Sequence, residues 1–184
     1  MFKEKFDINL DFLKMRSSPL IGVDISSSSV KMVELSMIGK GNHTYRIERY
    51  AIESMPTDTM LDGGIVNLEA VSECLQRGWK RMGTRQRNVA LALPVTDVIT
   101  KKIIVPAGQR EDDLAFQVET EASQYIPFSL DEVDLDFQVI RPTPNNPEEV
   151  EVLIAASRKE NVEDRVAAAL SGGLKTIIID VESY

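Results

Sequence analysis

The sequence predicts a mixed α/β protein, and three observations support this fold class. β-prone runs with a two-residue apolar alternation recur along the chain, for example at 133–140 and 150–156. Between such runs lie segments whose apolar residues recur at helical spacing. The composition, 43% hydrophobic and 27% charged, is that of an ordinary globular protein of one sizeable domain or two small ones. We therefore expect a mixed sheet covered by helices.

The charge, the single cysteine and the hydropathy exclude several classes of protein. A net charge of −8 argues against general nucleic-acid binding and against adsorption to an anionic membrane. Cys74 has no partner for an internal disulfide, and its place on an apolar helix face indicates a buried side chain. No apolar run approaches the ~20 residues that span a bilayer. The sequence also shows no secretory signal at the start of the chain.

The first segment, residues 1–19, has the pattern of an amphipathic helix followed by a linker. Phe2, Phe6, Leu10 and Leu13 recur at helical spacing among mixed charges. Such a helix packs on the body of the protein or contacts a partner, or the segment stays disordered. The mixed charges favour packing or a partner over a membrane anchor.

Residues 20–35 predict a hairpin with a polar tip. An apolar run ends in Asp24, the tip carries Ser26, Ser27, Ser28 and Ser29, and a second strand contains Lys31. Successive N–H groups at such a tip can hold an anion, and the serine hydroxyls add donors. Asp24 would face a water of a bound Mg²⁺, and Lys31 would reach a phosphate. The alternative is a plain solvated turn, which is the commoner use of a serine run.

The rest of the first part predicts a third antiparallel strand, a helix and a buried strand. The third strand is expected at 44–54, after a turn at 39–43 whose His43 is read as solvated. Asn67 is a candidate N-cap for a helix over 68–82 that Gly83 ends. A continuous apolar strand follows at 88–93.

The rhythm of the sequence changes at Pro94, and from Val98 the pattern reads β-α-β-β-α-β, the order of a split βαβ sandwich. We expect a loop at 142–149 that turns the chain between its two middle strands, Asn161 as the cap of its second helix, and a final buried strand at 174–181. Its carboxylate clusters suit helix ends and solvated loops. The chain carries no nucleophile elbow, zinc motif or Walker loop. No catalytic residue is therefore assigned.

Particular segments of the chain resemble a known family. Residues 21–31 look like the first phosphate loop of the actin-like ATPase superfamily, although many of its members have glycine where Ser26 stands. The combination of the further segments resembles PilM, the family of cytoplasmic actin-like proteins of type IV pilus assembly. These segments are 98–102, 121–128, 134–137, 153–160, 173–174 and 177–182.

The resemblance implies a fold and a set of site residues. It implies the N-terminal half of an actin-like, RNase H-like fold with an inserted β-α-β-β-α-β subdomain, as in FtsA. The expected parts are the segment 1–19, a first subdomain at 20–93, the inserted subdomain at 94–173 and a return strand at 174–184. By resemblance, Asp24 lies near Mg²⁺, Ser26, Ser27, Ser28 and Ser29 hold the β-phosphate, and Lys31 neutralises phosphate charge.

The resemblance also implies a function. It implies a cytoplasmic scaffold, peripheral to the inner membrane, that binds the cytoplasmic N-terminal tail of PilN and links the motor of twitching motility to other pilus components. ATP and Mg²⁺ are the expected cofactors of a full-length protein. This chain is read as an N-terminal portion that binds nucleotide weakly, since the second phosphate loop and the adenosine pocket lie further along. The alternatives are an active ATPase, an FtsA-like division protein or the cytoplasmic domain of the type II secretion protein GspL.

Overall fold

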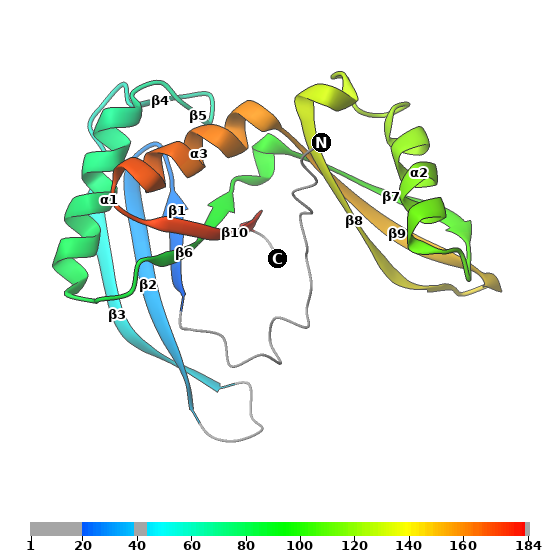
Figure 1. Ribbon diagram of the computed structural model, residues 1–184, viewed down its shortest axis with the longest axis horizontal. Coiled ribbons are helices and arrows are strands. Elements are labelled where there is room, and N and C mark those ends of the chain that lie inside the picture. The colour runs from blue at the N-terminus through cyan, green and yellow to red at the C-terminus, as the bar shows by residue number, and fades with distance from the viewer. Residues whose placement is uncertain (1–19, 39–43, 183–184) are drawn as a thin grey trace. The chain divides into compact units, whose positions relative to one another are not determined.

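The computed structural model describes residues 20–38 and 44–182, which form two units (Figure 1). The main unit comprises the described residues up to Asp97 and from Glu160 onwards, and the inserted unit comprises Val98–Lys159. The segment 1–19 and the turn that contains His43 lie outside the described residues. The mixed α/β class predicted from the sequence is confirmed.

The main unit is built on a five-stranded sheet with the strand order β10-β6-β1-β2-β3. β1, β2 and β3 form an antiparallel meander, and β6 and β10 run parallel to β1. The predicted hairpin, the third strand and the apolar strand at 88–93 are therefore confirmed. The five strands are β1 (Ile21–Ile25), β2 (Ser29–Ile38), β3 (Thr44–Ser54), β6 (Asn88–Leu93) and β10 (Lys175–Val181).

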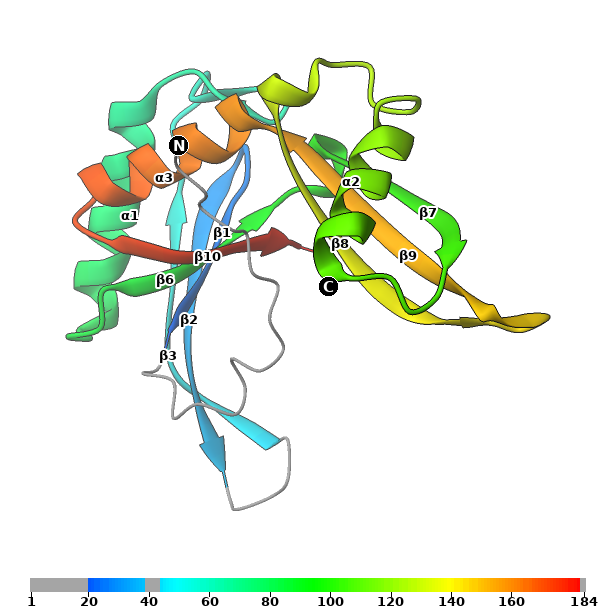
Figure 2. The same cartoon turned by 45° about the vertical axis from the view of Figure 1, so that its right-hand side comes forward.

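Two helices, α1 (Leu68–Met82) and α3 (Lys159–Ser171), cover one face of this sheet (Figures 1 and 2). α1 joins β3 to the parallel strand β6, and α3 precedes β10, which lies parallel on the far side of β6. Right-handed crossovers that advance in the same direction along a sheet place their helices on the same face. As predicted, the Asn67 side chain caps α1 by accepting a hydrogen bond from the Ala70 N–H at 3.0 Å. The prediction for Asn161 was wrong, because α3 already begins at Lys159.

The core of the main unit lies between this face and the two helices. Ile21, Val23 and Ile25 alternate inwards along β1 and are at most 4% exposed. Gly78 of α1 lies so close to β2 that a Cβ atom there would be 2.7 Å from the sulfur of Met32. The close contact explains why a helix interior carries a glycine here despite its cost of roughly 1 kcal/mol relative to alanine. Cys74, predicted to be a buried side chain, is fully buried.

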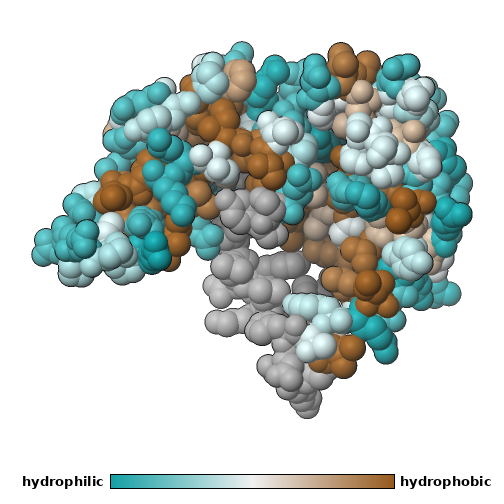
Figure 3. Space-filling view, turned by 180° about the vertical axis from the view of Figure 1, so that it is seen from behind, coloured by the Kyte–Doolittle hydropathy of each residue, from teal (hydrophilic) through white to brown (hydrophobic). Residues whose placement is uncertain are grey.

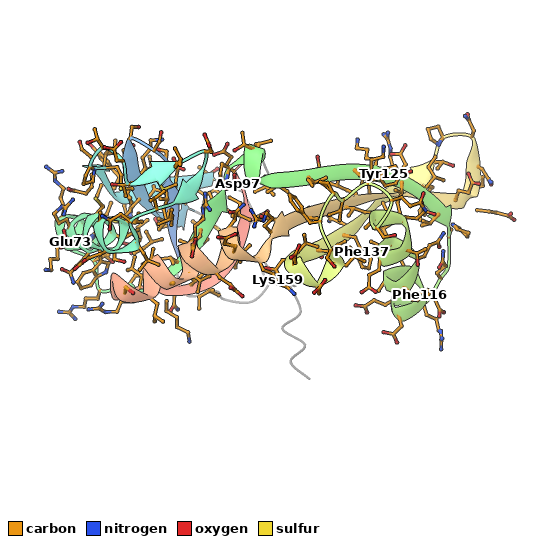
Figure 4. The ribbon with its side chains drawn as sticks, turned by 90° about the horizontal axis from the view of Figure 1, so that it is seen from above. Glu73, Asp97, Phe116, Tyr125, Phe137 and Lys159 are labelled. Atoms are coloured by element: carbon orange, nitrogen blue, oxygen red, sulfur yellow. The ribbon has the colours of Figure 1, made fainter. Side chains whose placement is uncertain are left out.

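The inserted unit has a three-stranded antiparallel sheet in the order β7-β9-β8, covered on one face by α2. Its core contains Val118 and Ala122 of α2 packed with alternate residues of the strands. Phe137 of β8 packs against this core, whereas Phe116 of α2 is 72% exposed (Figure 4). Its elements are β7 (Val98–Pro106), α2 (Glu111–Ala122), the 3-10 turn η3 (Leu130–Glu132), β8 (Val133–Thr143) and β9 (Asn146–Arg158).

Two expectations for this region differ from the structure. The predicted loop at 142–149 is a tight hairpin, since β8 continues to Thr143 and β9 begins at Asn146. Pro142 fits because β8 is an edge strand, where a missing N–H need not break a hydrogen-bond ladder. The inserted unit is also β-α-β-β rather than a split βαβ sandwich, because the chain returns to the main unit at Glu160 instead of after residue 173. β10 pairs with β6 in the main sheet, where the resemblance implies a return strand at 174–184.

A buried ion pair joins the two connections of the insertion within the main unit. Asp97 ends η2 (Val95–Asp97), the last residues before the insertion, and Arg165 lies in α3, the first element after it. The Arg165 guanidinium is fully buried and donates to Asp97 Oδ2 at 3.0 Å and to the Gly63 carbonyl at 2.9 Å. Gly63 precedes β5 (Gly64–Ile65), which pairs with β4 (Met60–Leu61). Three separate stretches of chain therefore meet at Arg165.

Removing one member of this pair is expected to destabilise the main unit strongly. Asp97→Ala leaves a buried guanidinium without its counter-charge, which costs about 3–5 kcal/mol in comparable pairs. In the double variant Asp97→Ala/Arg165→Met both charges are gone, so most of that loss is expected to be recovered. Urea unfolding of the two variants and the parent measures both changes. Equal stabilities of the parent and Asp97→Ala would contradict this account of the pair.

Candidate phosphate-binding turn and the open face of the main sheet

The tip between β1 and β2 is a tight turn closed by its own serines. The Ser26 N–H donates to the Ser29 carbonyl at 3.0 Å, and the Ser26 hydroxyl donates to the same carbonyl at 2.9 Å. The Met55 N–H donates to the Ser28 carbonyl at 2.9 Å, which fixes the turn to the end of β3. Ser27 and Ser28 are exposed at the tip. Exposed hydroxyls are accessible to an anion, which is the use that the sequence predicts for them.

Serine at position 26 introduces no backbone strain. Among the described non-glycine residues, positive φ angles occur at Asp58 and Asp62 and at no residue of the turn. A left-handed conformation at the first position of such a loop would favour glycine. The turn therefore forms with serine where many members of the superfamily have glycine.

Asp24 and Lys31 lie opposite each other on β1 and β2 and form an ion pair. Their Cα atoms are register partners, and Lys31 Nζ donates to Asp24 Oδ2 at 2.8 Å. The hydrogen bond to Asp24 and the charge of this carboxylate raise the pKa of Lys31 above its ordinary value. The side chains are 54% and 36% exposed, so water screens the pair and both groups remain accessible to a ligand.

The face of the sheet opposite the helices is hollowed beside this pair. The small residues Gly22, Ala90 and Ala92 line the floor of a hollow of about 450 Å³, and Asp24 and Lys31 lie on its wall. Glycine and alanine on adjacent strands leave room above the sheet, because alanine ends at its Cβ atom and glycine has no side chain. The hollow is lined by Asp24 and Lys31 but not by the four serines, which lie at the neighbouring tip.

Two carboxylates that sequence reasoning did not assign line the same hollow. Asp180 and Glu182 lie at the carboxyl end of β10, and Glu182 contributes to the raised pKa of Lys31 through its charge. The Glu182 N–H donates to the Leu93 carbonyl at 2.9 Å, and its carboxylate accepts a hydrogen bond from Val95 N–H at 3.4 Å. The signal in the sequence was an acidic residue directly after an apolar strand. Its position beside Asp24 depends on β10 being parallel to β1, which the sequence did not indicate.

The arrangement places Lys31 and the exposed serine hydroxyls close to acidic side chains. Lys31 and the exposed serine hydroxyls suit a phosphate, and Asp24 suits the water shell of a cation. In the described part of the chain, no group of three or more metal-ligating side chains is placed to hold a metal ion directly.

The family model for the type IV pilus assembly protein PilM matches residues 22–184. The chain belongs to this PilM family. A solved chain of the PilM–PilN type IV pilus biogenesis complex is 30% identical, with a TM-score of 0.78 over 89% of this chain. The match covers 47% of that solved chain, so this PilM-family chain spans about half the length of its relative.

A second solved structure has the same fold. The cytoplasmic domain of EpsL, an inner membrane component of the type II secretion system of Vibrio cholerae, is 13% identical with a TM-score of 0.54. The match covers 88% of this chain and 56% of that domain. The family model decides between the pilus and secretion readings in favour of PilM, and the predicted actin-like fold is confirmed. None of the described helices has the length and the apolar composition needed to cross a membrane.

The ion pair predicts a specific change in the titration of Lys31. Asp24→Asn removes the hydrogen bond to the carboxylate and its charge, so the pKa of Lys31 is expected to fall. Glu182→Gln, the matched control, removes a weaker and more distant charge and should lower the same pKa less. NMR titration of the lysine Nζ signals measures both. Equal shifts in the two variants would contradict the 2.8 Å contact.

Proposed function

We propose that this chain is part of a scaffold of type IV pilus biogenesis that binds the cytoplasmic N-terminal tail of PilN. The scaffold would lie at the cytoplasmic face of the inner membrane and link the motor to the assembly complex there. The observation that carries the proposal is the likeness to a chain of the PilM–PilN complex, at 30% identity over 89% of this chain. The family match over residues 22–184 supports the same assignment.

The surfaces of both units are compatible with recognition of a peptide. The main unit exposes Tyr50 and Ile52, and the inserted unit exposes Ile104 and Phe116, each above half of its full exposure. Apolar side chains of an extended or partly helical tail could bind to such groups, a common mode of peptide recognition. The proposed role therefore rests on contacts between proteins rather than on chemistry at a catalytic centre.

Binding of the tail is tested with a fluorescent peptide. A synthetic peptide of the PilN cytoplasmic N-terminus is expected to bind the folded chain saturably, as followed by fluorescence anisotropy. A peptide of the same composition in scrambled order is the control, since it keeps the charge and hydrophobicity but not the order of apolar anchors. Identical titrations for the two peptides, or no saturation with the tail, would overturn the proposal.

We further propose that the β1–β2 turn is one half of a nucleotide phosphate site. Ser26, Ser27, Ser28 and Ser29 would surround a β-phosphate, as the tight turn and its exposed hydroxyls suggest. Lys31 would neutralise the phosphate, and Asp24 would contact a water of Mg²⁺. Because these two side chains are paired at 2.8 Å, a bound nucleotide would have to replace their contact with two new ones.

Phosphate binding by this chain is expected to be weak and to be confined to the turn. Addition of Mg²⁺ and ATP should shift the amide NMR signals of Ser26–Ser29 at millimolar but not at micromolar concentration, since one turn supplies few contacts. Lys31→Ala should weaken the response, whereas Lys102→Ala, an exposed lysine of the inserted unit, should not. Saturation in the micromolar range would overturn the half-site proposal. Unchanged signals at the turn would overturn the assignment of the phosphate.

A further inference from the structure

Two short stretches of the main unit meet at the buried guanidinium of Arg165. Its Nη2 atom donates to the Gly63 carbonyl at 2.9 Å and to Asp97 Oδ2 at 3.0 Å, and its Nη1 atom donates to the Asn161 carbonyl of the same helix at 3.0 Å. Gly63 lies in the loop 56–66, and Asp97 ends η2. These contacts join a loop before α1, the turn before the inserted unit and the helix that follows this unit.

The loop 56–66 has little packing of its own. It contains β4 and β5, which pair with each other and not with the main sheet. Neither strand contains a buried residue. Figure 3 shows apolar atoms at the surface of this end of the main unit, at the upper right of the view. Because an isolated two-stranded ribbon is marginally stable in water, we attribute the position of the loop to its polar contacts, of which those with Arg165 tie it to a distant part of the chain.

The backbone of the loop is also strained around this contact. Among the described residues other than glycine, the two with positive φ angles, Asp58 at 61° and Asp62 at 48°, both lie in the loop. Left-handed backbone at such residues costs free energy and persists where the surrounding structure fixes it. Gly63 has a φ of 86°, and a Cβ atom there would be 2.7 Å from Asp97 Oδ1. Glycine at this position therefore allows the loop and the Asp97 carboxylate to reach Arg165 together.

The turn before the inserted unit is held in a similar way. None of the three residues of η2 is buried, and the Asp97 N–H donates to the Pro94 carbonyl at 2.9 Å. Arg165, by contrast, belongs to a helix whose Val162 and Ala169 are buried in the core. Segments with few buried apolar contacts open at a lower free energy than the core does. The loop and the turn are therefore the parts that can move, and Arg165 is the fixed side chain to which both bind.

We propose that residues 56–66 and 94–97 form a clasp that closes on Arg165 and opens as one unit. When the clasp is closed, both connections of the inserted unit are held: η2 by Arg165, and β9 by its direct continuation into α3, with no residue between strand and helix. When the clasp is open, the junction of β9 with α3 alone stays fixed. The inference is independent of the proposed binding of PilN and of phosphate.

Native-state hydrogen–deuterium exchange of the whole chain tests whether the clasp opens as one unit. The Val66 N–H in the loop and the Asp97 N–H in η2 are both hydrogen-bonded in the closed clasp. Their protection factors are expected to lie within about fivefold of each other and at least about tenfold below those of β6. The Ala169 amide of α3 should be protected like β6, because this helix does not open. A larger difference between Val66 and Asp97, or protection of both equal to that of β6, would overturn the proposal.

Gly63→Ala tests the link between the two stretches. The added Cβ atom would meet Asp97 Oδ1, so exchange at both Val66 and Asp97 is expected to rise about tenfold or more while β6 is unchanged. Gly83→Ala is the matched control, because Gly83 also has a positive φ, 63°, but a Cβ atom there meets no described atom within 4 Å. It should leave both amides of the clasp unchanged. Faster exchange at Val66 alone, or an equal rise throughout β6, would overturn the proposal.

A second pair of variants acts through a hydroxyl instead of a Cβ atom. The Thr59 hydroxyl donates to a backbone carbonyl of the same loop at 2.8 Å. Thr59→Val keeps the shape of the side chain but removes this bond, so exchange should rise at Asp97 as well as at Val66. Thr84→Val is the control and should change neither, since Thr84 is also buried and its hydroxyl also contacts a nearby backbone group, the N–H of residue 86. A rise at Val66 without one at Asp97 would contradict opening as one unit.

Discussion

The buried contact of Arg165 with Asp97 is the constraint on which the organisation of the main unit depends. A chain that is interrupted by a separate unit must bring its two interrupted ends together again before β10 can pair with β6. Asp97 is the last residue before the inserted unit, and Arg165 lies nearly two turns into α3, the helix that follows this unit (Figure 4 labels Asp97 and Lys159). Burial lowers the pKa of the guanidinium, and the charge of Asp97 opposes this effect. The counter-ion of the buried arginine is therefore supplied by the other connection of the insertion.

The same closure builds the candidate site. β10 can run parallel to β1 and β6 only because α3 returns the chain to the start of the sheet, and parallel strands bring their carboxyl ends to one edge. For this reason Asp24 and Lys31 line the same hollow as Asp180 and Glu182, although Asp24 precedes these two carboxylates by more than 150 residues in the sequence. The acidic groups and the turn are thus products of topology as much as of the local sequence.

Local signals in the sequence predicted most elements of the main unit. Features that depend on contacts between distant residues were not predicted. The serine turn, the Asn67 cap and the Gly83 end of α1 depend on neighbouring residues and could be read directly. Sequence reasoning did not identify Arg165 as a buried residue, because an arginine at a core position is unfavourable unless a distant carboxylate compensates it. The end of the inserted unit was likewise placed at residue 173 rather than before Glu160, because it depends on contacts between distant strands. Strand order decides whether β10 closes a small sheet or joins a large one, and periodicity carries no information on order.

The free edge of the main sheet has a property that follows from its irregular register. β3 is an edge strand, and Glu48 is an extra residue between the pairs Glu34–Arg49 and Leu35–Ile47. A bulge with charged neighbours interrupts the row of unpaired backbone groups that would otherwise serve as a template for another strand. The eleven-residue edge strand therefore carries a built-in interruption that disfavours pairing with a strand of another molecule.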